Sequence, residues 1–339
     1  MTHMADEIRE TPAAVARLLD REGANLARLG VALRDRGPRV IVTCARGSSD
    51  NAAAYFKYLT EILVGVPVAS VGPSVASVYR APLRLRDAVV VSVSQSGQSP
   101  DIVALQSAAR AAGAFSIAVV NATDSPLAET ADAVVPLHAG PEQSVAATKT
   151  CLASAVALAA LVGGWSGDSA LQAAVARLPD SLAGAVAQDW DAAVPVLAAA
   201  RSAYVVGRGP AFPVAAEAAL KLKETAVLHA EAFSGAEVMH GPLQLLKDGF
   251  PVVAFAQQDA SAEAMRTAIA RLRDAGARVF PVATEPLGPG TLPAAATGHA
   301  LLDPLGMLLS FYGLAKAVAQ ARGQDPDHPS LLRKVTETV

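Results

Sequence analysis

Residues 88–113 read AVVVSVSQSGQSPDIVALQSAARAAG, and the rest of the chain is organised around this segment. Its first six residues form a continuous apolar, β-branched run, which predicts a strand buried on both faces of a parallel sheet. From Pro100 onward, apolar side chains recur at helical spacing, with Pro100 in the first turn and Ser99 as a natural N-cap. The polar residues 94–99 therefore form a loop between the end of a buried strand and the start of a helix.

This loop, SQSGQS, has the composition of an anion-binding site. Free backbone N–H groups and the positive end of a helix dipole would face an anion there, and the serine hydroxyls and glutamine amides add donors. The loop has no lysine and no G-x-x-x-x-G-K-[ST] pattern, so it is not a nucleoside triphosphate loop, and one small phosphate monoester fits it better. The alternative is a Ser/Gly-rich turn that binds no ligand.

Strand and helix signals alternate along the chain, which is the pattern of a parallel sheet with helices on both faces. Two helices are expected ahead of the first sheet, from Asp6 to Leu19 and from Glu22 to Asp35. The strands expected in the first half are residues 39–44, 67–71, 88–93, 115–121 and 133–137. Those expected in the second half are residues 203–206, 251–257 and 278–283, and the helices that follow strands are residues 51–63, 100–113, 151–164, 212–228 and 260–275.

The two halves match each other at a constant offset of 162 residues. Arg46-Gly47 corresponds to Arg208-Gly209, and VSVSQ at residues 91–95 corresponds to VAFAQ at residues 253–257. An unchanged offset indicates duplication of one α/β domain. In the second copy the loop reads AQQDAS, and its Asp259 carboxylate would repel a phosphate. One phosphate site per chain is therefore expected, in the first half.

Composition and charge exclude several classes of partner. The chain has 339 residues, enough for two domains, and a formal net charge of −3 without a basic or acidic block, which argues against nucleic acid and anionic membranes. Cys44 and Cys151 have no metal-type spacing and are expected as buried thiols in a reducing compartment. The apolar helix at residues 151–164 is too short to span a bilayer, and the N-terminus lacks a signal-peptide core, so a cytoplasmic location is predicted.

Ionisable residues gather on a short segment of the second half. They are Lys221, Glu224, His229, Glu231, Glu237 and His240. Lys221 and Glu224 share a helix face, and taken alone such a pair is more often a solvated ion pair, just as a lone histidine is more often a core or cap residue. Together, however, the six residues form a set suited to general acid–base catalysis. No H-E-x-x-H or comparable spacing occurs, so no metal site is predicted.

With these motifs in place, the chain resembles the sugar isomerase (SIS) superfamily. The resemblance runs from Ile8 to Thr336 and rests on the combination of SQSG, LKLKE, HAEAF, HGP and a lysine close to the C-terminus. It extends to the isomerase half of glucosamine-6-phosphate synthase, the glutamine–fructose-6-phosphate aminotransferase. The patterns ARGSSD, PSVASVY, VAATK and KVT-x-T look closest to the stand-alone second type of glucosamine-6-phosphate deaminase. Nothing here corresponds to the glutaminase domain of the synthase, so no use of glutamine is expected.

The resemblance implies an α/β fold of two tandem SIS domains, each a parallel sheet flanked by helices in a three-layer, flavodoxin-like sandwich. We predict N-terminal helices at residues 1–36 and a first SIS domain with the phosphate site at residues 37–166. A helical linker at residues 167–200 is expected next. The second SIS domain, with the acid–base residues, is predicted at residues 201–325, and a C-terminal tail that closes the site at residues 326–339.

The resemblance also implies a role for each matching residue. The phosphate would be held by Ser49, Ser94, Gln95, Ser96 and Ser99, and the sugar would contact Gly47, Ser48, Val145 and Ala147, where Ala147 replaces a sugar-contacting serine of the synthase. Glu224 would move a proton between C1 and C2 of the open-chain sugar, and Lys221 would stabilise the developing enediol or enolamine charge. His240 would assist ring opening and, in a homodimer, reach into the site of the partner subunit. Lys334 matches the lysine that forms an imine with the ketose in the synthase.

The activity implied is conversion of glucosamine 6-phosphate to fructose 6-phosphate and ammonia, without metal or redox cofactor. The phosphate, remote from the reaction, would supply binding energy that fixes C1 and C2 over the base. Alternatives that use the same base are a plain phosphosugar isomerase, an ammonia-dependent amination and a fructosamine-phosphate deglycase. A sugar-phosphate sensor is the alternative from outside the enzymes. The sequence leaves open whether the hexosamine is gluco or galacto.

Overall fold

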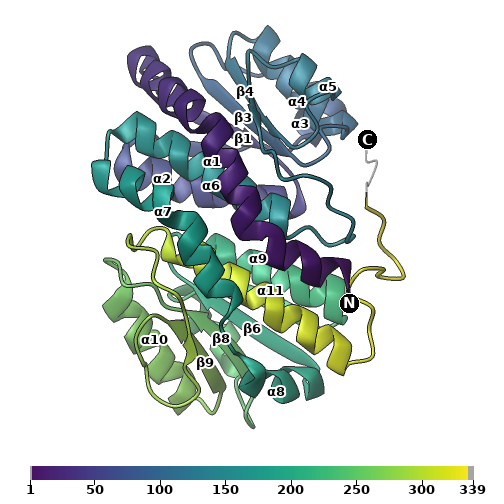
Figure 1. Ribbon diagram of the computed structural model, residues 1–339, viewed down its shortest axis with the longest axis vertical. Helices are drawn as coiled ribbons and strands as arrows, with labels where there is room; N and C mark the ends of the chain where they lie inside the picture. The colour runs from purple at the N-terminus through teal and green to yellow at the C-terminus, as the bar shows by residue number, and fades with distance from the viewer. Residues whose placement is uncertain (1, 335–339) are drawn as a thin grey trace. The chain divides into compact units, whose positions relative to one another are not determined.

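The computed structural model describes residues 2–334, which fold into two compact units (Figure 1). We call residues 13–142 and 149–176 the first-sheet unit, and residues 2–12, 143–148 and 177–334 the second-sheet unit. Each unit holds one five-stranded sheet in which every strand pair is parallel. Helices flank both sheets, so the predicted α/β fold is confirmed.

The first sheet has the strand order β2-β1-β3-β4-β5. Its strands are β1 Ile41–Cys44, β2 Val68–Ser70, β3 Val89–Ser94, β4 Phe115–Val120 and β5 Ala133–Pro136. β3 occupies the centre, and all six of its residues are buried. This is the position that its continuous apolar run predicts, because a central parallel strand is covered on both faces.

Five helices of the first-sheet unit each follow one of its strands. They are α2 Gly47–Leu63, α3 Ser74–Ser77, α4 Pro100–Ala111, α5 Pro126–Glu129 and α6 Lys149–Ser166. By length and composition, α6 could cross a membrane, but 89% of this helix is buried inside the protein, as in the core helix of a folded domain. The prediction that this helix is too short to span a bilayer is wrong, because α6 extends beyond the predicted residues 151–164 at both ends. The prediction that it is a buried helix is confirmed.

The N-terminal segment forms one helix, α1 His3–Arg36, and the prediction of two helices is wrong. Residues 3–12 of α1 belong to the second-sheet unit and residues 13–36 to the first. Buried apolar residues recur at helical spacing on both sides of Asp20 and Arg21, at Leu18, Leu26 and Leu33. No proline or glycine lies between Leu19 and Glu22, so the helix continues through this segment.

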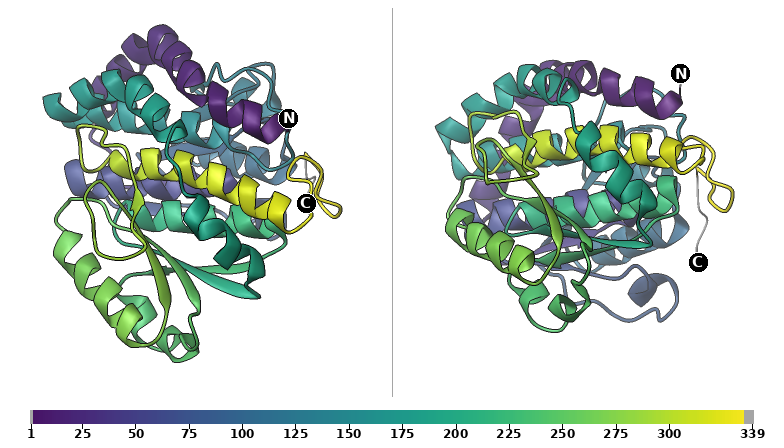
Figure 2. Two further views of the ribbon diagram at one scale, coloured as in Figure 1. Left: turned by 60° about the horizontal axis from the view of Figure 1, so that its bottom comes forward. Right: turned by 90° about the horizontal axis from the view of Figure 1, so that it is seen from below.

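The second sheet has the strand order β10-β9-β8-β6-β7. Its strands are β6 Ser202–Gly207, β7 His229–Ser234, β8 Pro251–Phe255, β9 Arg278–Ala283 and β10 Leu292–Pro293. The helical elements of this part of the chain are α7 Ser169–Val186, η1 Asp191–Ala193, α8 Val194–Ala199, α9 Ala211–Ala226, η2 Glu237–Met239, η3 Pro242–Leu245, α10 Ala262–Asp274 and α11 Asp303–Ala321. The yellow helix α11 packs along α9 (Figure 2).

The pairing register of the two sheets supports the duplication. In the first sheet Ile41 pairs with Val68, and in the second Ala203 pairs with Ala230, both 162 residues further along. Val42 and Val90 correspond in the same way to Tyr204 and Val252. The offset becomes 163 at β9, because Val89 pairs with Phe115 whereas Pro251 pairs with Arg278. The offset is therefore not constant, since one additional residue lies between β8 and β9.

Candidate functional site

The loop at residues 94–99 lies at the carboxyl end of β3 and leads into α4. The Ser94 hydroxyl accepts a hydrogen bond from the Gly97 N–H at 3.1 Å, and the Ser96 hydroxyl accepts one from the Gln98 N–H at 3.3 Å. Ser94 is buried, whereas Gln95, Ser96 and Ser99 are half-buried. Three of the four side chains predicted to bind phosphate here are therefore partly accessible at the start of a helix.

Gly97 is required at the turn of this loop. Its φ of +63° lies in the left-handed region, which side chains rarely adopt. A Cβ at this position would lie 2.1 Å from the Ser125 Oγ, closer than any real contact. The loop is also fixed from outside, because the Gln95 carbonyl accepts a hydrogen bond from the Asn121 N–H and the Gly97 carbonyl accepts one from the Leu127 N–H, at 3.1 and 3.2 Å.

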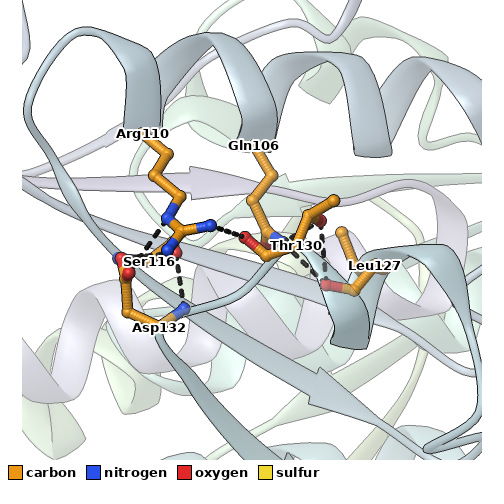
Figure 3. A network of polar contacts seen from close by, with 6 residues as sticks. All are labelled: Gln106, Arg110, Ser116, Leu127, Thr130 and Asp132. Atoms are coloured by element: carbon orange, nitrogen blue, oxygen red, sulfur yellow. Dashed lines mark hydrogen bonds and ion pairs between the residues drawn. The ribbon is translucent and has the colours of Figure 1, made fainter.

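A polar network holds α4, the helix that begins at the loop (Figure 3). The Gln106 amide on α4 donates to the Leu127 carbonyl at 2.7 Å and to the Thr130 hydroxyl at 2.8 Å. Leu127 thus accepts from α4 through its carbonyl and donates to Gly97 through its N–H. The middle of α4 and the loop at residues 94–99 are therefore fixed against the same residue of α5.

The same network ends at Asp132, just before β5 (Figure 3). One Asp132 oxygen accepts from the Arg110 Nε at 2.9 Å, and the other accepts from the Ser116 N–H at 2.9 Å and from the Ser116 hydroxyl at 2.8 Å. Burial by itself raises the pKa of Asp132, but the hydrogen bonds from Ser116 and Arg110 outweigh burial and lower that pKa below its ordinary value.

A second loop ends at the same edge of the first sheet. β1 ends at Cys44, and α2 begins at Gly47, so the residues expected as a loop up to Asn51 include the first turn of α2. Gly47 has a φ of +55°, and Ser48 and Ser49 are half-buried in that turn. Because β1 and β3 are neighbouring parallel strands, their carboxyl ends bring this turn and residues 94–99 to one edge.

An ion pair joins the two loops. The Arg46 guanidinium lies just before α2, and its Nε donates to the carboxylate of Asp101, in the first turn of α4, at 2.6 Å. Asp101 is completely buried, and its other oxygen accepts a hydrogen bond from the N–H of Ile102.

The Cys44 thiol lies at the end of β1, near the same carboxylate. Burial, with Asp101 and Asp50 close by, raises the pKa of the Cys44 thiol to about 12, so this cysteine is an unreactive core residue.

In the second-sheet unit, Lys221 lies between two carboxylates on α9. Its ammonium forms an ion pair with Glu224 and lies 3.4 Å from a Glu217 oxygen. Lys221 and Glu217 are almost completely buried, whereas the Glu224 side chain keeps 23% of its surface exposed. The Tyr312 hydroxyl from α11 donates to Glu217 at 3.2 Å. Glu217 and Tyr312 are not among the residues predicted from the sequence, although Glu217 precedes Lys221 by one helical turn, and that spacing is visible in the sequence.

The acid–base residues predicted downstream do not form one group. His229 begins β7 and is paired with the Ser202 hydroxyl at 2.8 Å through its Nδ1. His240 follows η2, beyond the other end of β7, and is exposed. A six-residue strand spans about 20 Å, so the two histidines lie at opposite ends of β7, and the inclusion of His229 in an acid–base set is wrong.

Three further predicted residues lie close to one another in the second-sheet unit. The Lys334 ammonium donates to the Ser144 carbonyl at 2.6 Å, and the next residue, Val145, donates its N–H to the Asp327 carbonyl at 3.2 Å. Val145 and Ala147 are half-buried. The structure therefore brings the end of the described chain against residues 143–148. Residue 1 and residues 335–339 of the predicted N-terminal segment and tail lie outside the described residues.

In the equivalent loop of the second sheet, an aspartate side chain occupies the backbone and side-chain donors. The Asp259 carboxylate accepts from the Ser261 N–H at 2.8 Å and from the Gln257 amide at 3.0 Å, directly before α10. The donors that would face a phosphate are therefore already bound to a carboxylate of the loop itself.

Among residues 2–334, no group of three or more His, Cys, Asp or Glu residues is arranged to hold a metal ion.

Comparison with known proteins gives the family. The SIS domain family model matches residues 36–163 and 196–290, which is more than half of the chain. The chain belongs to the SIS domain family. The resemblance inferred from its motifs is thereby confirmed, and the two matched segments of this SIS-domain protein fall on the two sheets.

Three relatives illustrate the range of SIS-domain proteins similar to it. Glutamine–fructose-6-phosphate aminotransferase (isomerizing) of Symbiobacterium thermophilum is 36% identical over 98% of this chain and 58% of its own length. A candidate phosphosugar isomerase from Silicibacter pomeroyi DSS-3 has 46% identity and a TM-score of 0.90, over 96% of this chain and 100% of that structure. A glucosamine-6-phosphate deaminase from Thermotoga maritima shares the fold, with 20% identity and a TM-score of 0.78 over 99% of this chain and 100% of that one. The chain spans less than three fifths of the length of the Symbiobacterium thermophilum aminotransferase and of the one from Aeropyrum pernix.

Proposed function

We propose that this SIS-domain protein is a phosphosugar isomerase that deaminates glucosamine 6-phosphate to fructose 6-phosphate. The observation that carries the proposal is the partly exposed Glu224 carboxylate, paired with the fully buried Lys221 on α9. A carboxylate held in this way is positioned to take up and deliver a proton while the fixed ammonium balances negative charge.

Phosphate binding is assigned to the two loops of the first-sheet unit. Ser94, Gln95, Ser96 and Ser99, with Ser49 from α2, would hold the phosphate with hydroxyl, amide and helix N-terminal donors. Gly47 and Ser48 would contact the sugar, as would Val145 and Ala147. Because the phosphate is remote from C1 and C2, its binding energy would position the reacting carbons.

The proposed reaction begins at C2 of the open-chain sugar. Glu224 removes the C2 proton to give an enolamine, with Lys221 stabilising negative charge at the oxygen on C1, and then returns the proton to C1. The product carries an iminium group at C2. Water adds to C2, ammonia leaves, and a ketone remains, so that one water is consumed for each ammonia released. His240 of the partner subunit is proposed to assist ring opening, and Lys334 to act near the ketose carbonyl.

The test measures the ammonia that the purified protein releases from glucosamine 6-phosphate or galactosamine 6-phosphate. A separate assay measures whether the protein isomerises glucose 6-phosphate to the ketose phosphate. Deamination of one of the amino sugars is the expected result. The alternative of a plain aldose–ketose isomerase has the support of the 46% identical candidate phosphosugar isomerase. That alternative is correct if only the non-aminated sugar reacts.

A matched pair of variants tests the base. Glu224→Gln keeps the shape of the side chain and removes the proton acceptor, so turnover should fall by about a hundredfold or more while substrate binding persists. Glu263→Gln is the control, because Glu263 forms an exposed ion pair with Arg266 at the same helical spacing. If both variants keep normal turnover, Glu224 is only a structural ion pair.

A further inference from the structure

We propose that the second-sheet unit carries a separate binding site for a small organic phosphate, in a hollow at the amino end of its sheet. The hollow has a volume of about 680 Å³. It lies between α8 and the segments that enter β6, β8 and β9. The residues that line it and carry the argument are Pro195, Arg201, Ser202, Lys247, Phe250 and Arg278.

The first observation is an excess of positive charge, since three cations and one carboxylate line the hollow, and the Arg278 guanidinium also lies over the Phe280 ring. Arg201, Lys247 and Arg278 are all exposed, and within the described residues 2–334 none of them forms an ion pair. Asp248 is the one carboxylate among the lining residues. Three cations facing one open volume repel one another, and an anion bound between them would relieve that repulsion.

The second observation is that the fold fixes where the three cations lie. Arg201 directly precedes β6, Lys247 lies in the turn before β8, and Arg278 begins β9. These strands are neighbours in a parallel sheet, so their starts share one edge.

Backbone hydrogen bonds then hold the turn before β8 against the start of β9. Gly249 donates its N–H to Gly276 at 2.9 Å, and Arg278 donates its N–H to Phe250 at 2.9 Å. Asp248 and Gly249 both have positive φ, of +53° and +78°. The position of Lys247 beside Arg278 therefore follows from a defined turn.

The residues that line the hollow indicate that the ligand has an organic part in addition to its phosphate. Beside the cations, the lining includes Pro195, Val196 and Phe250, which offer apolar surface. The volume lies in the range of about 300–1,000 Å³ that is common for small-molecule sites, and a bare phosphate would leave most of it unfilled. The class that fits is a phosphate ester whose organic part packs against Pro195 and Phe250. None of the lining residues belongs to the proposed catalytic or substrate-binding set.

One side chain connects this hollow to the end of α9. The Arg322 guanidinium donates to the carbonyls of Ala198 and Ala200, beside the hollow, at 2.8 and 2.9 Å. The same guanidinium donates to the carbonyls of Ala226 and Val227 at the end of α9, at 2.8 and 3.2 Å. Because α9 carries Lys221 and Glu224, a ligand in the hollow would influence turnover, a consequence that rests on the proposed function.

Calorimetric titration of the full chain with inorganic phosphate, glucose 1-phosphate and adenosine 5′-monophosphate tests the site. We expect at least one of the two esters to bind more tightly than inorganic phosphate. The variant Arg201→Gln/Lys247→Gln/Arg278→Gln should weaken that binding at least tenfold. A matched variant, Arg28→Gln/Arg84→Gln/Arg271→Gln, removes three exposed arginines outside the hollow and should bind the ester as the wild type does. Thermal unfolding confirms that both variants are folded.

Repeating the titration in Ser96→Ala separates this site from the proposed substrate site. Binding that survives in Ser96→Ala and is lost in the first triple variant supports the proposal. Equal binding in wild type and the first triple variant, loss of binding only in Ser96→Ala, or no preference for an ester overturns it. These are binding measurements, so they are decided independently of whether the protein releases ammonia. If it does, the bound ester should change that rate in the wild type and leave it unchanged in the first triple variant.

Discussion

The guanidinium of Arg46 and the carboxylate of Asp101 form an ion pair that joins the start of α2 to the first turn of α4. The Asp101 carboxylate is completely buried, whereas 48% of the Arg46 side chain is exposed. A buried carboxylate without its cation is strongly unfavourable, so this pair holds the two loops at one edge of the first sheet in a fixed arrangement.

Arg46→Gln should therefore lower the free energy of unfolding by about 1–3 kcal/mol, because it leaves a buried charged acceptor without its charged donor. Chemical denaturation measures this change. Arg208→Gln is the matched control, since Arg208 has the duplicate position in the second half and forms no ion pair in the part of the chain that the structure describes. Equal losses in the two variants would show that the pair with Asp101 contributes nothing specific.

Gly97→Ala should be more destabilising than an alanine at any open left-handed glycine. The left-handed backbone alone costs about 1–2 kcal/mol, and at Gly97 the new Cβ also collides with Ser125. Gly37→Ala is the control, because Gly37 has a φ of +60° with no atom within 4 Å of its Cβ position. Thermal unfolding of the two variants separates the cost of the backbone from the cost of the collision. If Gly37→Ala is equally damaging, the close approach to Ser125 is not the reason for glycine.

Much of the first half could be predicted from the sequence because its signals are local. The run at residues 88–93 has no periodicity and must be buried on both faces, and β3 is indeed central. The six-residue loop after it needs only a strand end and a proline at the first turn of a helix, both of which are visible in the sequence.

The features that were not predicted, β7 and the contact of Tyr312 with Glu217, depend on interactions between segments that are distant in the sequence. β7 is an edge strand with exposed His229 and Glu231, so no apolar run marks it, and only the 162-residue correspondence with β2 indicates it. Tyr312 reaches Glu217 across 95 residues, and no local pattern connects them. Duplication could have supplied the strand, but the partner on α11 required the packed fold.

Lys221→Met should lower the free energy of unfolding by about 3–5 kcal/mol, because Glu217 would remain as a buried charge without its cation. Lys223→Met is the control, an exposed lysine on the same helix. Adding Glu217→Gln to Lys221→Met should restore part of the stability. It should not restore turnover if Lys221 also stabilises the reaction's negative charge. Recovery of both would make Lys221 a structural residue only.

Stability should depend on pH through Asp132. The folded protein lowers the pKa of Asp132 below its ordinary value of 3.8, so the unfolded chain binds the proton more readily. The stabilising contribution is therefore fully present above the unfolded pKa and is lost as the pH falls through the lower folded pKa. Asp132→Asn should lower the free energy of unfolding by about 0.5–1 kcal/mol at pH 7, a small change because Asp132 lies at the surface, and by progressively less below pH 3.8, as measured by denaturation at several pH values. Glu129→Gln, at an exposed carboxylate on α5, should show no such pH-dependent difference.

The two loops of the duplication provide the control for phosphate binding. Ser96→Ala and Ser99→Ala each remove a donor from a proposed dianion site, so each should raise the Michaelis constant for the sugar phosphate about tenfold, with a smaller effect on kcat. Ser261 has the position of Ser99 in the second loop, where its N–H and hydroxyl bind Asp259. Because that carboxylate already uses the donors, Ser261→Ala should leave the Michaelis constant unchanged. A rise caused by Ser261→Ala, with no rise for Ser96→Ala or Ser99→Ala, would move the phosphate site to the second loop.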